Sequence, residues 1–161
     1  MGSEMCIRDS KKGCVGGNTE LLHLDDWGDR EEFLNSKFAE RDMILVRGYL
    51  TRHEALKRWH EEDLTVAMSS PFYQRDGEYY SRVVSEHMHA IDDEGDVWFK
   101  TLIDSLAECK ATRNLPLEPG SILILNNTFW FHGRSPIQRN PNLFRRYLRI
   151  KGYWKDSSEI F

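Results

Sequence analysis

A histidine near the C-terminal end of the chain has a residue type and a position that could bind a metal. His132 ends the apolar run Phe129-Trp130-Phe131. A neutral imidazole is a favoured ligand of Fe(II), but a histidine at such a place is more often a hydrogen-bonded residue of the core. Both interpretations stay open on this residue alone.

The segment that follows His132 is basic, although the chain as a whole has a net charge of −4. Residues 134–153 contain no Asp or Glu, and their bases are Arg134, Arg139, Arg145, Arg146, Arg149 and Lys151. Arg145 and Arg149 are four residues apart, so in a regular strand their side chains share one face. Two guanidinium groups on one face can each bind a carboxylate through two hydrogen bonds. The spacing therefore predicts a pocket for a small dianion.

A solvated basic strand or a nucleic-acid patch would also produce a basic segment. Nucleic-acid sites usually draw bases from several elements and interleave them with exposed aromatic side chains. Here the bases lie on one segment among apolar residues that are typical of a core. The acidic net charge also argues against a polyanion-binding protein, so we expect a small anion and no nucleic acid as partner.

Short strands separated by turns must position these residues. A glycine-rich turn over 13–18 leads into an expected strand at 19–24, and further strands are expected at 42–50, 77–89, 121–125, 129–132 and 143–154. Helices are expected over 27–40, over 51–62 from a capping box at Thr51, and over 94–110. This pattern predicts a mainly β fold with flanking helices, such as an antiparallel β-sandwich or jelly roll.

Length and composition narrow the class of protein further. The chain has 161 residues, enough for one domain with a sizeable core. It has no apolar run of the roughly 18 residues that a membrane span needs, so we expect no membrane partner. Its three cysteines, Cys6, Cys14 and Cys109, are odd in number and form no CxxC motif. They predict free thiols in a reducing compartment, and we expect the cytoplasm.

Three segments, in order, carry a resemblance to a known family: GGNTELLHLDDW, EPGSILILNNTFWFHGRSP and PNLFRRYLRIKGYW. They resemble the C-terminal part of the carbon-starvation-induced glutarate 2-hydroxylases. These enzymes are Fe(II)/2-oxoglutarate-dependent dioxygenases of the taurine dioxygenase and clavaminate-synthase-like superfamily. The resemblance implies a double-stranded β-helix, a cupin-like jelly roll, that is incomplete at its N-terminus. Residues 13–161 would be the C-terminal part of one dioxygenase domain, and residues 1–12 a non-native or disordered head.

The resemblance also implies an activity. Iron and O2 would convert glutarate to 2-hydroxyglutarate, while the cosubstrate 2-oxoglutarate is decarboxylated to succinate and CO2. It further implies a homo-oligomer, a tetramer, with a role in lysine degradation. The same chemistry on another small carboxylate or amino acid, and a catalytically inactive anion-binding fragment, remain alternatives.

Particular residues take roles from this resemblance. His132 matches the distal iron ligand, and Arg145 matches the arginine that binds the 5-carboxylate of 2-oxoglutarate. Thr19, after the GGN turn, matches a hydroxyl that helps to bind the same carboxylate. Arg149 is expected to bind a substrate carboxylate, more from strand geometry than from the match.

The family also needs an HxD motif, which lies upstream of the GGN turn and for which residues 1–12 leave no room. His23-Leu24-Asp25 has the HxD spacing, but an aspartate before a helix also serves as a cap. His87 and His89 form a second candidate pair on one strand face. We expect neither pair to bind iron, so the chain would carry one of three ligands, and its activity alone stays open.

Overall fold

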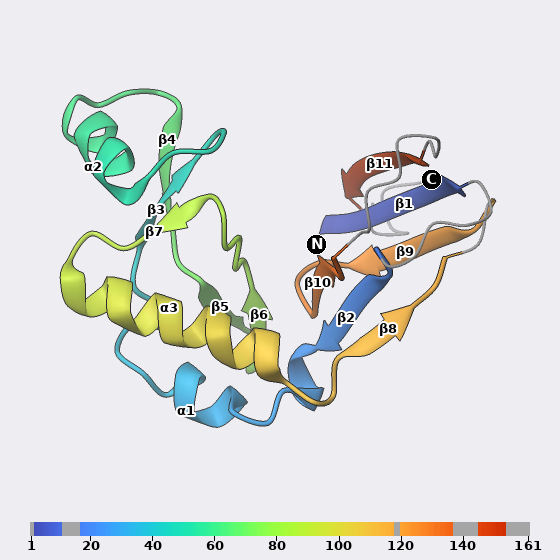
Figure 1. Cartoon of the computed structure of the whole chain (residues 1–161). Coiled ribbons are helices and arrows are strands. Elements are labelled where there is room, and N and C mark those ends of the chain that lie inside the picture. Colours follow the sequence, from blue (N-terminus) through green and yellow to red (C-terminus); the bar gives the residue numbers. More distant parts are fainter. Residues whose placement is uncertain (1, 11–16, 118–119, 137–144, 154–161) are drawn as a thin grey trace, which may run out of the picture. The chain divides into compact units, whose positions relative to one another are not determined.

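The computed structural model of the chain describes residues 2–10, 17–117, 120–136 and 145–153 (Figure 1). Within 2–10 and 145–153 it describes the backbone only. The chain forms two compact units. Unit 1 consists of Met1–Leu24 and Ala111–Phe161, and unit 2 consists of Asp25–Lys110. The expected domain boundary at residue 13 stays a prediction.

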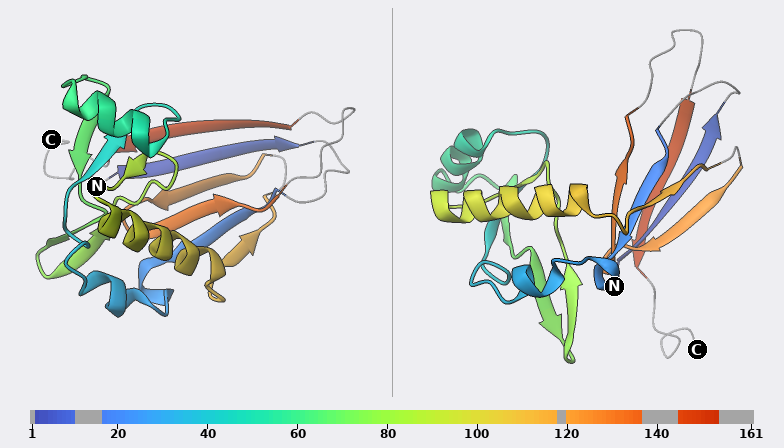
Figure 2. Two further views of the ribbon diagram at one scale, coloured as in Figure 1. Left: turned by 60° about the vertical axis from the view of Figure 1, so that its left-hand side comes forward. Right: turned by 60° about the horizontal axis from the view of Figure 1, so that its bottom comes forward.

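Unit 1 is built from antiparallel strands in two three-stranded sheets, which Figure 2 shows from two further sides. One sheet has the order β11-β1-β9 and the other has the order β10-β2-β8. The strands are β1 (Gly2–Ser10), β2 (Thr19–His23), β8 (Arg113–Leu115), β9 (Ile122–Asn126), β10 (Trp130–Arg134) and β11 (Arg145–Tyr153). In β2, Leu21 and Leu22 are both buried although they point to opposite faces, so this central strand is covered on both sides.

The turn between β9 and β10 fixes where β10 begins. The Asn126 side chain accepts hydrogen bonds from the backbone amide of Thr128 at 3.2 Å and from its hydroxyl at 2.7 Å. The Phe129 amide donates to the Asn126 carbonyl at 3.0 Å. An Asn that bonds the backbone two residues on mimics a backbone turn. The Asn-Asn-Thr sequence therefore starts the strand that carries His132.

Unit 2 contains three α-helices and two sheets among its described residues, and a short 3-10 helix, Leu24–Asp26, lies at its start. The helices are α1 (Arg30–Leu34), α2 (Arg52–His60) and α3 (Asp93–Glu108). The sheets are β4-β3-β7 and the hairpin β5-β6, formed by β3 (Met43–Val46), β4 (Val66–Ser69), β5 (Phe72–Arg75), β6 (Glu78–Ser81) and β7 (Met88–His89). Ala55 of α2 packs against Ile44 and Val46 of β3 in one buried cluster. A separate aromatic cluster forms where Trp27 stacks on Phe33 and Phe72.

Several expected elements are confirmed, but the strand expected over 42–50 is limited to Met43–Val46, and two further elements also differ in length. The capping box at Thr51 is present, with reciprocal hydrogen bonds between Thr51 and Glu54. The helix expected over 27–40 is reduced to α1, because the Ser36 hydroxyl accepts from the Phe38 amide at 3.3 Å and competes with the helical pattern. The strand expected over 77–89 is divided into β6 and β7, with a turn in which the His87 amide donates to the Val84 carbonyl.

The N-terminal residues differ from the expected disordered head. Residues 2–10 form β1, which pairs with both β9 and β11 in the first sheet of unit 1. That this segment is non-native stays a prediction. Strands outnumber helices in the described residues, as the predicted mainly β class requires. None of the described helices has the length and apolar character needed to cross a membrane.

Candidate functional site

The register of the β10-β2-β8 sheet places Thr19 and His132 on one face. His132 is paired with Leu21, and Arg134 is paired with Thr19. Directly opposed residues of antiparallel strands share a face, as do residues two apart in one strand. We call this surface the His132 face, and it is made up of Thr19, Leu21, His23, Arg113, Leu115, Trp130, His132 and Arg134.

His132 itself is exposed, whereas the residues before it, Trp130 and Phe131, are half-buried. The interpretation of His132 as a residue of the packed core is therefore wrong. An exposed imidazole on a sheet face is sterically able to bind a metal ion, and this part of the metal-ligand prediction is compatible with the structure.

Gly17 and Asn18, the two described residues before Thr19, are held by hydrogen bonds to the segment after His132. The Asn18 amide donates to the Ser135 hydroxyl at 2.9 Å, and the Ser135 amide donates to the Asn18 carbonyl at 3.1 Å. One step further, the amide of Gly17 donates to the Pro136 carbonyl at 3.0 Å. Gly17 is buried and has a φ of 65°, which favours glycine. These contacts continue the β2-β10 pairing and fix Thr19 opposite Arg134.

Arg145 and Arg149 both lie in the single strand β11, as the shared-face prediction requires. In the backbone register Arg145 is opposite Ser10 and Arg149 is opposite Cys6. The structure describes only the backbone of these two residues and not their side chains. Their roles at the two carboxylates therefore stay predictions.

The residues of the His23-Leu24-Asp25 motif have other contacts. The His23 ring meets the Trp130 ring edge-on at a centroid distance of 4.8 Å and stacks near Phe129 at 6.2 Å. The Asp25 carboxylate forms an ion pair with Arg30 of α1 at 2.5 Å. These contacts give both side chains a structural role, and the expectation that the motif is not an iron site stays a prediction.

The second candidate pair is also held by neighbours of its own unit. The His87 Nδ1 atom lies 3.0 Å from the Gly48 carbonyl, and its ring lies 5.1 Å from that of Tyr49. His89 has a buried Nε2 atom with no hydrogen-bond partner. Burial is the main cause that lowers the pKa of His89 below its ordinary value, so this imidazole is held neutral at pH 7.

The described residues contain no group of three or more His, Cys, Asp or Glu side chains that could hold a metal ion. Within this part of the chain, His132 is the one residue that matches an expected iron ligand. The described residues therefore fit one position of a two-histidine, one-carboxylate iron site and do not complete it.

Two residues of this region were missed by sequence reasoning. Ser135 holds the turn before Thr19, and Arg113 of β8 places its guanidinium carbon 5.9 Å from the centroid of the Trp130 ring. Sequence spacing could not find Ser135, because its hydrogen bond joins it to a residue 117 positions away. It could not find Arg113, because this residue lies in a three-residue strand that has no periodic pattern. Only the register shows that Arg113 lies opposite Leu21 and so on the His132 face.

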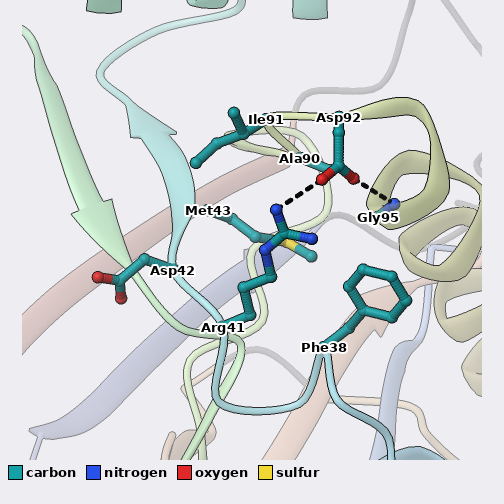
Figure 3. Close-up of a pocket in the computed structure, with 8 residues that line it drawn as sticks. All are labelled: Phe38, Arg41, Asp42, Met43, Ala90, Ile91, Asp92 and Gly95. Carbon is teal, nitrogen blue, oxygen red and sulfur yellow. Dashed lines mark hydrogen bonds and ion pairs between the residues drawn. The ribbon is translucent and has the colours of Figure 1, made fainter.

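Unit 2 has a small depression of its own, shown in Figure 3, where Arg41 and Asp92 face each other. An Arg41 Nη2 atom lies 2.5 Å from the Asp92 carboxylate, which also accepts from the Gly95 amide at 2.8 Å and so caps α3. The Gly95 hydrogen bond and then Arg41 hold the pKa of Asp92 below its usual range. A Cβ on Gly95 would come within 3.0 Å of the Asp92 carboxylate. This close packing marks a structural junction and not a ligand site.

Comparisons with known proteins find relatives that match nearly the whole chain. A family model described as CsiD matches residues 5–154. A glutarate 2-hydroxylase of Citrobacter koseri is 29% identical over 98% of this chain and 46% of its own length. The glutarate 2-hydroxylase of Klebsiella pneumoniae is 30% identical over 98% of this chain and 46% of its own length. That of Salmonella typhimurium is 31% identical over 93% of this chain and 43% of its own length.

Solved structures give the same fold. A non-heme iron oxygenase, OrfP, in complex with Fe and alpha-ketoglutaric acid has a TM-score of 0.57 at 16% identity, covering 92% of this chain and 43% of its own. An asparagine oxygenase in complex with Fe(II), 2S,3S-3-hydroxyasparagine and succinate has a TM-score of 0.58 at 13% identity, with 93% and 44% covered. The predicted jelly-roll class is thereby confirmed. The chain spans about half the length of the curated relatives it matches.

Proposed function

The chain belongs to the CsiD family, and on that premise we propose that it takes part in the iron- and 2-oxoglutarate-dependent hydroxylation of glutarate to 2-hydroxyglutarate, with release of succinate and CO2. The relatives that match nearly the whole chain are named glutarate 2-hydroxylases. The observation that carries the proposal is the pairing of β2 with β10, since it brings Thr19 onto the face that holds His132.

In this proposal His132 supplies one of the iron ligands through its imidazole. When bound, the iron supplies the oxidation by O2, with 2-oxoglutarate as the reductant. His132 is exposed on its strand and is therefore accessible to a metal ion. No described residue matches the carboxylate or the second histidine of the iron site, so we expect this chain alone to bind iron weakly.

Thr19, Arg145 and Arg149 would bind the two small dianions. The Thr19 hydroxyl, held in place through the Asn18–Ser135 hydrogen bonds, would donate to the 5-carboxylate of 2-oxoglutarate. Arg145 would bind the same carboxylate, and Arg149 a carboxylate of glutarate, each through a charge-assisted pair of hydrogen bonds. The chain's excess of basic residues over 134–153 supports a site for dianions over one for neutral substrates.

The direct test is mass spectrometry of products. The 161-residue chain and, in parallel, one of its longer relatives are incubated with glutarate, 2-oxoglutarate, Fe(II) and O2. Formation of 2-hydroxyglutarate together with an equal amount of succinate supports the proposal. Succinate release that is stimulated by another small acid or amino acid, and not by glutarate, would show that the substrate is wrong while the chemistry is right.

A catalytically inactive anion-binding fragment is the second candidate function, favoured by the absence of a three-ligand group among the described residues. It predicts 2-oxoglutarate binding that does not change when Fe(II) is added. Calorimetry with and without the metal distinguishes the two functions.

We also propose that the protein works in the cytoplasm as a homo-oligomer, a tetramer, with O2 and a small dicarboxylate as its other partners. The cysteine pattern supports the reducing compartment. Light scattering of the purified protein measures the oligomeric state, and a monomer at micromolar concentration would contradict it.

A further inference from the structure

We propose that Asn126 is a positioning residue that holds strand β10 in register and so keeps His132 on the face that carries Thr19. This inference rests on the proposed function, in which His132 binds the metal ion, and deepens it by naming a residue that acts through that ligand. A strand that shifts by one residue turns all its side chains to the other face of the sheet. The placement of His132 therefore depends on the contacts that fix the two ends of the β10-β2 pairing.

Hydrogen bonds extend the pairing of β10 with β2 beyond both ends of the strands. Before β10, the Leu24 amide donates to the Phe129 carbonyl at 2.8 Å. After β10, Ser135 exchanges hydrogen bonds with Asn18. His132 lies midway between these two contacts, three residues after Phe129 and three residues before Ser135. The contacts at both ends therefore fix the register at His132.

The contact before β10 depends on the side chain of Asn126, the last residue of β9. The Asn126 Oδ1 atom accepts hydrogen bonds from the Thr128 amide at 3.2 Å and from the Thr128 hydroxyl at 2.7 Å. Thr128 is buried, and a buried donor that loses its acceptor is costly. The Asn126 carbonyl also accepts from the Phe129 amide at 3.0 Å. One residue therefore closes the turn that sets where the pairing with β2 begins.

This turn also joins strands of two different sheets within unit 1. β9 belongs to the β11-β1-β9 sheet, and β10 belongs to the β10-β2-β8 sheet. Only residues 127–129 connect the two strands. An Asn side chain that bonds the backbone two residues on produces a defined turn, so a connection this short passes its geometry directly to β10. Without that side-chain acceptor, the first residue of β10 is no longer fixed from β9.

The neighbouring residue Asn127 offers a matched comparison. It is the same residue type in the same turn, but its buried Oδ1 atom has no hydrogen-bond partner. Removal of this oxygen breaks no hydrogen bond and takes away a buried polar atom that is not compensated. A general effect of shortening an asparagine in this turn would appear at both positions. A role of the Asn126 acceptor would appear at Asn126 alone.

The experiment compares Asn126→Ala with Asn126→Asp, which keeps the side-chain acceptor, and with the control Asn127→Ala. Amide hydrogen exchange measures the protection of β10 and, for reference, of β3 in unit 2. Anaerobic calorimetry on the 161-residue chain measures 2-oxoglutarate affinity with and without Fe(II). Thr128→Val, which removes only the hydroxyl donor to Asn126, takes the place of Asn126→Ala if that variant does not fold.

We expect Asn126→Ala to speed amide exchange in β10 by about tenfold and to leave β3 unchanged, because the pairing opens locally. The gain in 2-oxoglutarate affinity produced by Fe(II) should fall about tenfold, as when a residue that orients a metal ligand is removed. The metal-free affinity should stay within about twofold, since the change acts through the metal ligand. Asn126→Asp should restore both quantities, and Asn127→Ala should behave as the unchanged chain.

Unchanged exchange in β10, or faster exchange with the full Fe(II) gain retained, would overturn the positioning role of Asn126. The same holds if Asn126→Asp restores neither quantity, or if Asn127→Ala causes an equal loss. If the unchanged chain shows no gain in affinity with Fe(II), the proposed function fails. The exchange rates of β10 then uphold or overturn the register role of Asn126 by themselves.

Discussion

Thr19 and His132 lie on the same face of the β10-β2-β8 sheet, two register positions apart, because His132 is opposite Leu21 and Thr19 is opposite Arg134. The two residues are more than a hundred positions apart in the chain. Their proximity is produced by backbone pairing, which the hydrogen bonds between Asn18 and Ser135 extend beyond the strand ends. The proposed metal ligand and the proposed carboxylate-binding hydroxyl thereby lie on one sheet, which is the kind of rigid support that an active site needs.

Replacement of His132 tests the metal-ligand role. We expect His132→Ala to remove the Fe(II)-dependent part of 2-oxoglutarate binding, a loss of at least about tenfold, because the variant loses an imidazole ligand. The measurement is calorimetric titration of 2-oxoglutarate with and without Fe(II). His53→Ala, at an exposed position of α2, is the control and should keep the metal dependence. Unchanged metal dependence in His132→Ala would exclude it as a ligand.

Replacement of Ser135 tests whether the backbone at Asn18, next to Thr19, is held by the residue that follows β10. Ser135→Ala removes the acceptor of the Asn18 amide, and a lost hydrogen bond of this kind costs about 1 kcal/mol. We expect a lower free energy of unfolding in urea together with weaker 2-oxoglutarate binding, since Thr19 is no longer fixed. The control Ser85→Ala changes an exposed serine of unit 2 and should alter neither quantity. A stability loss with unchanged affinity would limit Ser135 to a structural role.

The pH dependence of stability should contain a contribution from His89. Burial is the largest cause that lowers the pKa of this imidazole; Arg52 and His87 lower it further, while a hydrogen bond with the Leu50 backbone and the Asp96 carboxylate oppose the shift. Below the ordinary pKa of 6.5 the unfolded chain binds a proton at His89 that the native chain resists. The stabilising contribution is therefore complete above that pH and is lost as the pH falls through 6.5 toward the native value.

His89→Gln checks this prediction because glutamine does not titrate. Urea unfolding of the unchanged chain and of the variant is compared from about pH 8 to pH 5, and the slope in the unchanged chain should be larger. Val97→Ala, a change at an exposed position that carries no titratable group, should keep the original slope. Identical slopes for the unchanged chain and His89→Gln would contradict the lowered pKa.

The core of unit 2 should depend strongly on one face of α3. Leu102 is fully buried, whereas Val97 on the same helix is 66% exposed. We expect Leu102→Ala to lower the free energy of unfolding by about 2–5 kcal/mol, because it leaves a cavity in the core. Val97→Ala should change it by less than about 0.5 kcal/mol, as for a surface position. Denaturant unfolding of both variants gives the comparison, and equal effects would contradict this orientation of α3.

Local chemistry explains which elements could be predicted. Thr51 and Glu54 satisfy each other's hydrogen-bonding groups within one helical turn, so the start of α2 follows from four consecutive residues. Asp76 and Gly77 have positive φ values of 54° and 82°. Asp-Gly adopts this backbone conformation readily in a two-residue hairpin turn, so the β5-β6 turn also follows from neighbouring residues. In contrast, α1 ends early because Ser36 bonds the backbone amide of Phe38, a local competition that apolar periodicity alone did not reveal.

The sequence by itself determined the mainly β class and the family, and it singled out His132 as the candidate iron ligand, because strand patterns and motif order are properties of consecutive residues. Only the tertiary structure decided which side chains share a face with His132. Strand register sets that outcome, and a shift of one residue would move Thr19 and Arg113 to the other side of the sheet. Spacing along the chain contains no information about pairing between segments as distant as β2, β8 and β10.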